Sequence, residues 1–245
     1  MGVLNEWLAV ARSLRVYRLD RAHARGLRRI YGEFVGAGDL VIDVGAHVGD
    51  RVAAFRALGA RVVAVEPQAR LVRVLRLLHG RDPGVRVLRA ALGPEDGEAV
   101  LLLNPANPTV ATRSRGFVAA AAGAPGWENQ RWLGRETVPA ATLDALIAAH
   151  GPPAFVKIDV EGFEAEVLAG LSLPPPALSF EVVAAFRGAG RAALARAAAL
   201  GYRDFRLSLG ESHVWAGEWT DAAAMDAAIA ALPDAANSGD VYCRR

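Results

Sequence analysis

Cysteine is almost absent from this 245-residue chain, which holds Cys243 alone. An internal disulfide bond is therefore excluded, and because disulfide-free proteins suit a reducing compartment, we expect a cytoplasmic location. Long hydrophobic runs are also missing, since no apolar stretch approaches the roughly 20 residues that a membrane-spanning helix needs. The N-terminus has no apolar signal-peptide core, and Glu6 disrupts the myristoylation pattern after Gly2. The sequence predicts a protein without a transmembrane segment.

A strong excess of charge is lacking too, because 28 basic residues stand against 26 acidic ones for a net charge of +2. The imbalance is local: within residues 1–30, seven arginines face only Glu6 and Asp20. The remaining 21 basic and 24 acidic residues make a poor surface for phosphate. No nucleic-acid partner is therefore expected.

Residues 1–33 form a basic N-terminal segment, in which apolar residues spaced among the arginines predict one helix over 3–31. We expect this helix to pack on the domain with its arginines simply exposed to solvent. The alternatives are a lid, or a basic face for an anionic substrate or for peripheral contact with a membrane surface. The same helix, with exposed tryptophans, could serve a homodimer.

Residues 34–245 alternate apolar strands with amphipathic helices, which predicts a single α/β domain with a doubly wound, mostly parallel sheet and an antiparallel late strand. Strands are expected at 40–44, 61–65, 85–92, 99–103, 154–159, 177–183, 202–207, 211–215 and 240–243. Helices are expected at 49–58, 71–78, 142–150, 162–170, 191–200 and 221–232, the last capped by Thr220. Residues 104–139 break this alternation, and a loop of such length predicts a functional insertion that faces the substrate.

The stretch 40–50 carries the clearest functional pattern. A buried strand from Leu40 to Val44 runs into a turn at Gly45, and Gly49 opens the next helix. A strand that passes through a glycine turn into a helix directs free backbone N–H groups at a ligand above the sheet. The residues of this predicted cofactor cradle are Asp43, Gly45, Ala46, His47, Val48, Gly49 and Asp50.

The following strands extend the same predicted site. The strand 61–65 ends in Glu66 and Pro67, where nucleoside-binding folds place a carboxylate on ribose hydroxyls. Farther along, the small side chain of Ala91, next to Leu92, would let a flat adenine ring lie against the chain. A nucleoside cofactor is therefore expected.

The acids around the cradle select among nucleoside cofactors. The dinucleotide pattern G-x-G-x-x-G is not met, because Gly45 is followed by His47. Asp43 and Asp50 would repel a pyrophosphate, but a cationic nucleoside such as S-adenosylmethionine would tolerate them. The acids therefore favour a cationic nucleoside over a dinucleotide.

Lysine is the scarcest charged residue, since Lys157 is the only lysine among the 28 basic residues. Lys157 and Asp159 share one face of the strand 154–159, Glu161 follows the strand, and Glu181 lies on the next apolar strand. Charges in core strands are costly unless they are paired or used, so we interpret all four as catalytic. The alternative for Lys157 is a buried ion pair with Glu181 that merely fixes strand register. His213, on an expected late hairpin, could also reach the site.

Together these motifs resemble the FkbM-type methyltransferases, whose typical order they follow over roughly residues 34–183. The matching blocks are Asp43-Val-Gly-Ala-His-Val-Gly-Asp50, Val65-Glu-Pro67, Ala90-Ala-Leu-Gly93, Thr142-Leu-Asp144, Lys157-Ile-Asp-Val-Glu-Gly162 and Phe180-Glu181. The family commonly has Asn where this chain has His47. The resemblance implies a class I methyltransferase fold of the Rossmann-like kind, S-adenosylmethionine as cofactor, and O-methylation of a hydroxyl on a small molecule or glycan.

Methyl transfer from a sulfonium is an in-line displacement, so it requires orientation of the acceptor and removal of the hydroxyl proton. On this interpretation residues 45–49 hold the methionine portion, Glu66 the ribose, and residues 91–92 the adenine. The acceptor would be oriented or deprotonated by Asp159, Glu161 or Lys157, with Glu181 tuning Lys157.

The predicted site contains no metal, although a variant has Asp159, Glu161 and Glu181 hold a hard divalent ion that acidifies the acceptor hydroxyl. Three other classes remain open. These are a nicotinamide-dependent oxidoreductase on the same fold, a nucleic-acid methyltransferase that uses the Arg-rich N-terminus, and a non-catalytic nucleoside-binding or scaffold protein.

Overall fold

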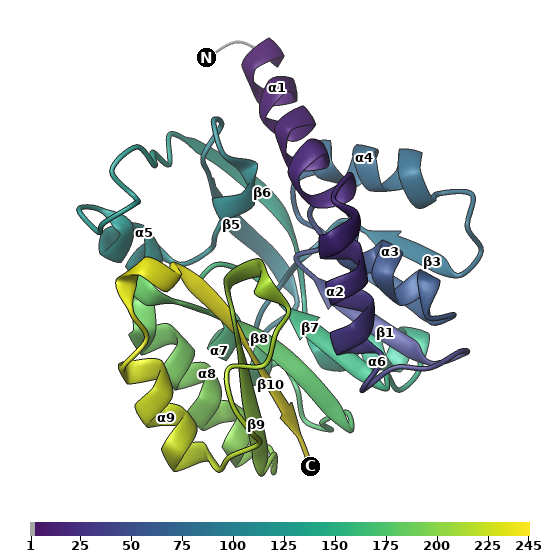
Figure 1. The fold of residues 1–245 in the computed structure, drawn as a ribbon. Helices are drawn as coiled ribbons and strands as arrows, with labels where there is room; N and C mark the ends of the chain where they lie inside the picture. The colour runs from purple at the N-terminus through teal and green to yellow at the C-terminus, as the bar shows by residue number, and fades with distance from the viewer. Residues whose placement is uncertain (1–2) are drawn as a thin grey trace.

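The computed structural model describes the backbone of residues 3–245 and the side chains of residues 7–245. Its centre is a seven-stranded sheet with the order β3-β2-β1-β7-β8-β10-β9 (Figure 1). Neighbouring strands pair in parallel from β3 to β8, whereas β10 runs antiparallel to both β8 and β9. The predicted mostly parallel sheet with an antiparallel late strand is confirmed. The strands are β1 (Leu40–Val44), β2 (Arg61–Val65), β3 (Val85–Leu88), β7 (Phe155–Ile158), β8 (Ala177–Val183), β9 (Asp204–Leu209) and β10 (Ser238–Arg244).

A second, three-stranded sheet contains β4 (Ala91–Leu92), β5 (Gly97–Leu103) and β6 (Gly134–Ala141). The single strand expected over 85–92 is wrong, because the chain leaves the main sheet after β3 and Ala91 and Leu92 pair with β6. The segment 104–139 is also more regular than expected, since it holds α5 (Arg115–Ala121) and most of β6. With a glycine and Pro139, β6 has the composition of a loop, so only its pairing with β5 identifies it.

Four helices cover one face of the main sheet: α6 (Leu143–His150), α7 (Glu164–Ala169), α8 (Arg187–Ala199) and α9 (Ala222–Ala230). The strands turn apolar residues such as Ile42, Val156 and Phe180 toward these helices. The cap of α9 is Asp221 and not Thr220, because the Asp221 carboxylate accepts a hydrogen bond from Ala224 N at 2.8 Å. This face is the larger apolar core of the domain.

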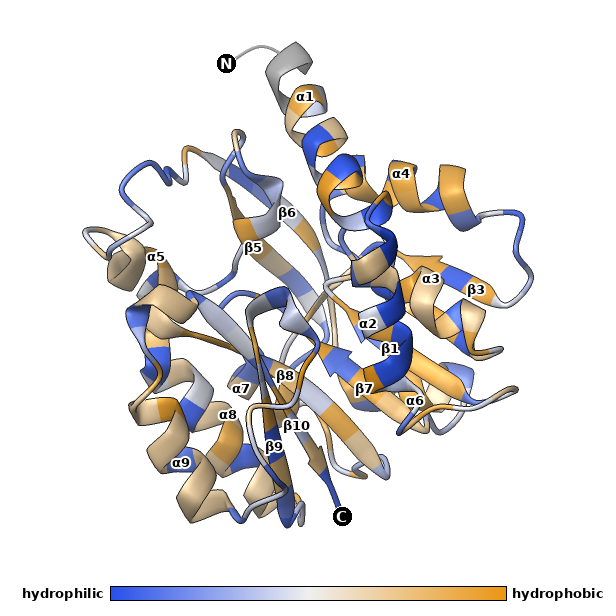
Figure 2. Cartoon of the chain, in the orientation of Figure 1, coloured by the Kyte–Doolittle hydropathy of each residue, from blue (hydrophilic) through white to orange (hydrophobic). Residues whose placement is uncertain are grey.

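The opposite face is covered by α2 (Arg21–Tyr31) and α3 (Asp50–Ala57), with α4 (Ala69–His79) beside them. Figure 2 shows a mostly hydrophilic α2 above strands that are largely hydrophobic. Buried polar residues nevertheless lie on this face. Asp43 and Lys157 follow Val41 and Phe155 by two residues, and alternate residues of a strand point to the same face of the sheet. Asp43 is opposite Lys157 in the sheet, and Lys157 is opposite Ser179.

The N-terminal segment is broken where one helix was expected. It comprises α1 (Val3–Ser13), a π-helical stretch η1 (Leu14–Arg18) and α2. Asp20 caps α2 by accepting hydrogen bonds from Ala22 N at 2.7 Å and His23 N at 3.2 Å. Asp20 lies between two helical stretches and caps the second, so the prediction of a single helix over 3–31 is wrong.

The sequence predicted that the arginines of this segment would simply be exposed to solvent. This is wrong for at least two of them. Arg12 donates a hydrogen bond to Ala106 O at 3.1 Å, and Arg18 donates to Gly49 O at 2.8 Å. Apolar residues of α1 and η1 pack on α4. The hydrogen bond from Arg18 attaches the segment to Gly49, where α3 begins. None of the helices among residues 3–245 is long and apolar enough to cross a membrane.

The expected strand 211–215 is also absent from the described residues. In its place are a 3-10 turn, η4 (Gly210–Ser212), and a single bridge between Ser208 and Trp215. His213 has a left-handed backbone with φ of 50°, which an extended strand excludes.

Candidate functional site

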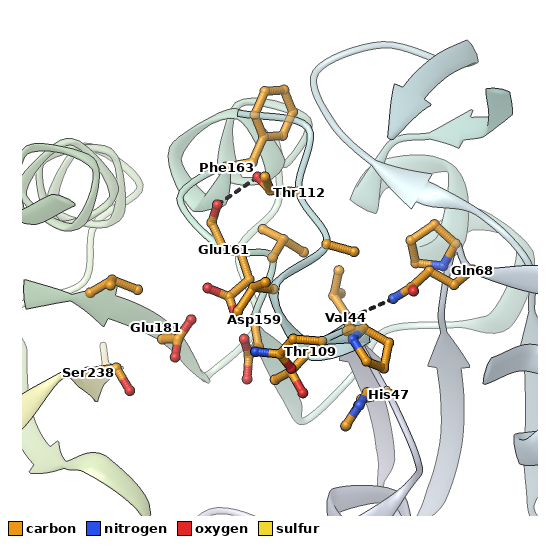
Figure 3. A pocket seen from close by; sticks show the side chains of 18 of the residues that line it. Val44, His47, Gln68, Thr109, Thr112, Asp159, Glu161, Phe163, Glu181 and Ser238 are labelled. Atoms are coloured by element: carbon orange, nitrogen blue, oxygen red, sulfur yellow. Dashed lines mark hydrogen bonds between the residues drawn. The ribbon is translucent and has the colours of Figure 1, made fainter. Parts of the chain in front are cut away.

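A cavity of about 460 Å³ lies at the carboxyl ends of the parallel strands (Figure 3). Its walls include Gly45 after β1, Glu66 after β2, Asp159 after β7 and Glu181 on β8. Parallel strands end at the same edge of a sheet, and the crevice outside that edge is where open α/β folds bind ligands. A volume of this size is within the range of small-molecule sites, roughly 300–1,000 Å³.

The cavity brings together nine of the residues predicted for the site: Gly45, His47, Glu66, Pro67, Ala91, Leu92, Asp159, Glu161 and Glu181. The structure places the remaining predicted residues behind its wall: Asp43, Ala46, Val48, Gly49, Asp50 and Lys157. Val48, for example, packs among the apolar residues that join α1 to α4. These residues shape the turn or the core and do not reach the cavity.

The glycine turn is held by its own backbone. Gly45 N and Ala46 N donate to Val65 O at 2.9 and 3.0 Å, and Gly49 N donates to Ala46 O at 2.8 Å. His47 N donates to Oε2 of Glu66 at 3.0 Å. The expectation that these four N–H groups are free for a ligand is therefore wrong. They lock the loop in the conformation that forms one wall of the cavity.

Glycine is required at position 45 because the ends of β1 and β7 approach closely. Gly45 has φ of +83°, and a Cβ atom there would lie 1.9 Å from the carbonyl oxygen of Asp159. Any side chain would therefore force the two strand ends apart.

Glu66 is buried in the cavity wall with 3% of its surface exposed. Its carboxylate accepts hydrogen bonds from His47 N at 3.0 Å and from Gln68 N at 2.9 Å. Burial raises the pKa of Glu66 to about 7, although the two amides act in the opposite direction. An ionised carboxylate has about four acceptor positions, so Glu66 can still accept hydrogen bonds from a pair of hydroxyls.

Asp50 faces the N-terminal segment and not the cavity. Its Oδ2 atom lies 2.8 Å from Nε2 of His23 and 3.0 Å from Nη1 of Arg51. Burial acts to raise the pKa of Asp50, but Arg51 and His23 hold it well below its usual value. His213, predicted to reach the site, instead contacts His23, with Nε2 2.9 Å from Nδ1. Burial lowers the pKa of His213 to about 4, so its ring is neutral at pH 7.

Arg51 is a cavity residue that the sequence analysis missed. Its guanidinium lies 3.0 Å from Asp50, 3.2 Å from Glu211 and 3.8 Å from Asp159. Arg51 thereby joins the turn after β1 to the end of β7 and to the loop after β9. In a chain with so many arginines, its sequence position gave no indication of this role.

Lys157 pairs with Asp159 and Asp240, and the alternative of an ion pair with Glu181 is wrong. Nζ of Lys157 lies 3.2 Å from Oδ2 of Asp159 and 2.9 Å from Oδ1 of Asp240. Sheet register explains the difference, because Glu181 lies opposite Asp240 while Lys157 lies opposite Ser179. Burial acts to lower the pKa of Lys157, but the two carboxylates raise it above its usual value. The ammonium of Lys157 is thereby held in its protonated form, in contact with Asp159.

Three carboxylates converge on the cavity beyond Lys157. Asp159, Glu161 and Glu181 can each place one oxygen within 4.8 Å of the others, and Figure 3 shows them grouped at one end. The Glu161 backbone has φ of 57°, and its carbonyl accepts a hydrogen bond from Oγ1 of Thr112 at 2.7 Å. Burial raises the pKa of Glu161 and of Glu181 well above the usual value. Burial acts likewise on Asp159, but Lys157 and Arg51 lower its pKa, so it remains ionised.

The segment 104–139 forms much of the remaining wall. Its cavity residues include Thr109, Val110, Arg113, Trp127 and Gln130, and η1 adds Tyr17. The ring of Trp127 packs edge-on against Phe117 of α5, with centroids 5.3 Å apart. Apart from the general expectation of an insertion that faces the substrate, the sequence identified none of these residues.

The sheet order, the turn after β1, the acid after β2 and the cavity at the strand ends define the class I S-adenosylmethionine-dependent methyltransferase fold. The structure is similar to the O-methyltransferase from Bacillus cereus in complex with SAH, with a TM-score of 0.50 at 11% identity over 99% of this chain and 89% of that chain. A TehB-like SAM-dependent methyltransferase from Corynebacterium glutamicum is similar at 11% identity and a TM-score of 0.49, over 98% of this chain and 96% of that one.

The family is established by sequence. The family model of the methyltransferase FkbM domain matches residues 43–185, more than half of the chain. The protein therefore belongs to the FkbM methyltransferase family, and the resemblance inferred from its motifs is confirmed. Among curated proteins, none matches this chain in sequence.

Proposed function

We propose that this protein transfers a methyl group from S-adenosylmethionine to a hydroxyl of a small molecule or glycan. One observation carries the proposal: a single cavity has Glu66 at one end and the carboxylates Asp159, Glu161 and Glu181 at the other. Glu66 follows β2 and Glu181 lies on β8, with β1 and β7 between them, a separation of roughly 14 Å at the usual strand spacing. The cavity can therefore hold a nucleoside and an acceptor side by side.

The residues at the first end fit a sulfonium nucleoside. Glu66 is fixed by two backbone amides and keeps acceptor positions for the two ribose hydroxyls. Ala91 and Leu92 offer a flat apolar wall for adenine, and the turn at Gly45 to His47 borders the methionine portion. S-adenosylmethionine supplies a methyl group activated by the positive sulfur, a charge that the acidic wall favours.

The residues at the other end act on the acceptor hydroxyl. Asp159 is the carboxylate that Lys157 and Arg51 keep ionised, so it can accept a hydrogen bond from the hydroxyl or its proton. Lys157 acts as a positioning residue, because it touches Asp159 and not the cavity. Acceptor selectivity is assigned to the segment 104–139, whose side chains line the space between the two ends.

Calorimetry with S-adenosylhomocysteine tests the nucleoside end. Glu66→Gln removes one ionisable acceptor at nearly constant volume and should weaken binding at least tenfold, about 1.4 kcal/mol. Glu136→Gln is the control, since Glu136 lies on β6 away from the cavity and pairs with Arg89. Transfer of a labelled methyl group to a panel of hydroxylated acceptors then tests the reaction. Equal affinity in Glu66→Gln, or no binding by the wild type, would overturn the assignment.

A further inference from the structure

The three carboxyl groups beyond Lys157 lie close together, and among the described residues only Asp159 of the three contacts a cation. Asp159, Glu161 and Glu181 come from the end of β7, the loop after it and β8, and their oxygens lie within 4.8 Å of one another. The nearest cations are Nζ of Lys157, 3.2 Å from Asp159, and Nη2 of Arg51, 3.8 Å from Asp159. Both contact Asp159, so within residues 7–245 no cation pairs directly with Glu161 or Glu181.

Glu161 gives the clearest indication of a bound ligand. It is buried, with 7% of its surface exposed, and it lines the cavity. Within residues 7–245, no hydrogen bond or ion pair satisfies its carboxylate. Oε2 of Glu181 is likewise buried without a hydrogen-bond partner in that range. A buried carboxylate oxygen without a partner is costly, and one that lies beside a second buried carboxyl group in a cavity wall points to a bound positive ligand.

The donor set identifies the chemistry of that ligand. Carboxylate oxygens without histidine or cysteine are the ligands of hard divalent cations such as Mg²⁺ and Mn²⁺. Such ions take six or more oxygen ligands, so three carboxylates leave positions for water or a substrate oxygen. Phe163 and Val183 also line this part of the cavity, and an apolar surround strengthens a charge interaction there.

We propose that Asp159, Glu161 and Glu181 together bind one divalent cation, Mg²⁺ or Mn²⁺, and that this cation takes the hydroxyl oxygen of the methyl acceptor. This departs from the metal-free site expected from the sequence. The role at the acceptor rests on the proposed function, whereas the binding of the ion does not. The cation makes the hydroxyl more acidic, and the hydroxyl gives its proton to Asp159. Its oxygen then forms the bond to the methyl carbon, and the methyl–sulfur bond breaks with its electron pair left on sulfur.

Titration with Mn²⁺, followed by the electron paramagnetic resonance signal of the free ion, tests the site on the full chain without cofactor. The wild type should bind one Mn²⁺ that excess Mg²⁺ displaces. Glu161→Gln and Glu181→Gln keep the side-chain volume and should each weaken Mn²⁺ binding at least tenfold. Retained binding of S-adenosylhomocysteine by these variants shows that they are folded.

Glu66→Gln is the matched control, because it changes a buried carboxyl of the same cavity at the nucleoside end. It should retain Mn²⁺ binding while it loses S-adenosylhomocysteine. No Mn²⁺ binding by the wild type at millimolar concentration, or equal binding by Glu161→Gln, would overturn the cation site. If Mn²⁺ binds as expected but no acceptor is methylated, the proposed function fails and the ion site stands.

Discussion

The ammonium of Lys157 lies 2.9 Å from Oδ1 of Asp240, a carboxylate on the last strand of the sheet. Lys157 has no exposed surface, and its second partner is Asp159 at 3.2 Å. The pair therefore joins β7 to β10 across β8, which lies between them. One buried lysine holds the antiparallel end of the sheet to the strand that carries the candidate catalytic carboxylate.

Removal of this ammonium should destabilise the fold strongly. Lys157→Met leaves Asp240 buried without its cation and Asp159 with Arg51 alone, and breaking a buried ion pair costs about 3–5 kcal/mol. Urea unfolding at pH 7 measures the loss. The double variant Lys157→Met/Asp240→Asn should recover part of it, because fewer unpaired charges remain.

The control for Lys157 is Arg191→Met, which breaks an ion pair with Asp226 on the exposed side of α8. Exposed pairs are solvated and contribute little, so this variant should unfold near the wild-type urea midpoint. A loss in Lys157→Met no larger than that in Arg191→Met would contradict the structural role of the buried lysine.

Gly45→Ala should be far more harmful than a glycine change elsewhere. The added methyl would lie 1.9 Å from the Asp159 carbonyl, at a backbone φ of +83°. Backbone strain alone costs about 1–3 kcal/mol, so a total loss of at least about 2 kcal/mol is expected. Gly188→Ala on α8 is the control, since no atom lies within 4 Å of its Cβ position. Thermal or urea unfolding that ranks the two variants equally would refute the close approach of β1 and β7.

Asp43 should make the stability of the ligand-free protein fall as pH rises. Both of its carboxylate oxygens are buried without hydrogen-bond partners in the described chain, and burial raises its pKa from 3.8 to about 7. Between these values the native state holds a proton that the unfolded state has released. The stabilisation is therefore complete below pH 3.8 and is lost as pH rises to 7.

The variant Asp43→Asn cannot titrate and so isolates this contribution. From pH 5 to pH 8 the wild type should lose about 2–3 kcal/mol relative to the variant, from roughly 1.4 kcal/mol per pH unit. Unfolding by urea at several pH values in a chelating buffer provides the comparison. Parallel pH profiles would show that Asp43 is ionised in the native protein.

Variants of Trp127 and Trp132 can distinguish a role in the cavity from a role in the apolar cluster around Phe117. Both rings contact Phe117, at 5.3 and 5.9 Å between centroids, but Trp127 alone of the two lines the cavity. Trp127→Ala should lower kcat/KM for the acceptor at least tenfold and spare binding of S-adenosylhomocysteine. Trp132→Ala removes a partly buried ring of the same cluster that does not line the cavity, and it should keep both. Equal kinetic losses in the two variants would mean that the segment 104–139 acts only through its stability.

Several features of the fold followed from local chemistry alone. Apolar runs such as 40–44 and 177–183 predicted strands at those residues, because a strand buried on both faces needs a continuous apolar stretch. The positions of Gly45 and Glu66 directly after strands predicted that both would lie at one edge of the sheet. The carboxyl groups of Asp159, Glu161 and Glu181 were predicted for the same site because each is an acid within or just after an apolar strand.

Partners from distant parts of the chain were decided only by the tertiary structure. His23 and His213 are 190 residues apart, and their contact depends on how the N-terminal segment crosses the domain. The pairing of Lys157 with Asp240 depends on β10 lying beside β8, a neighbour that no local pattern specifies. Sequence periodicity determines which face a residue occupies, whereas strand order and register determine which residue it meets there.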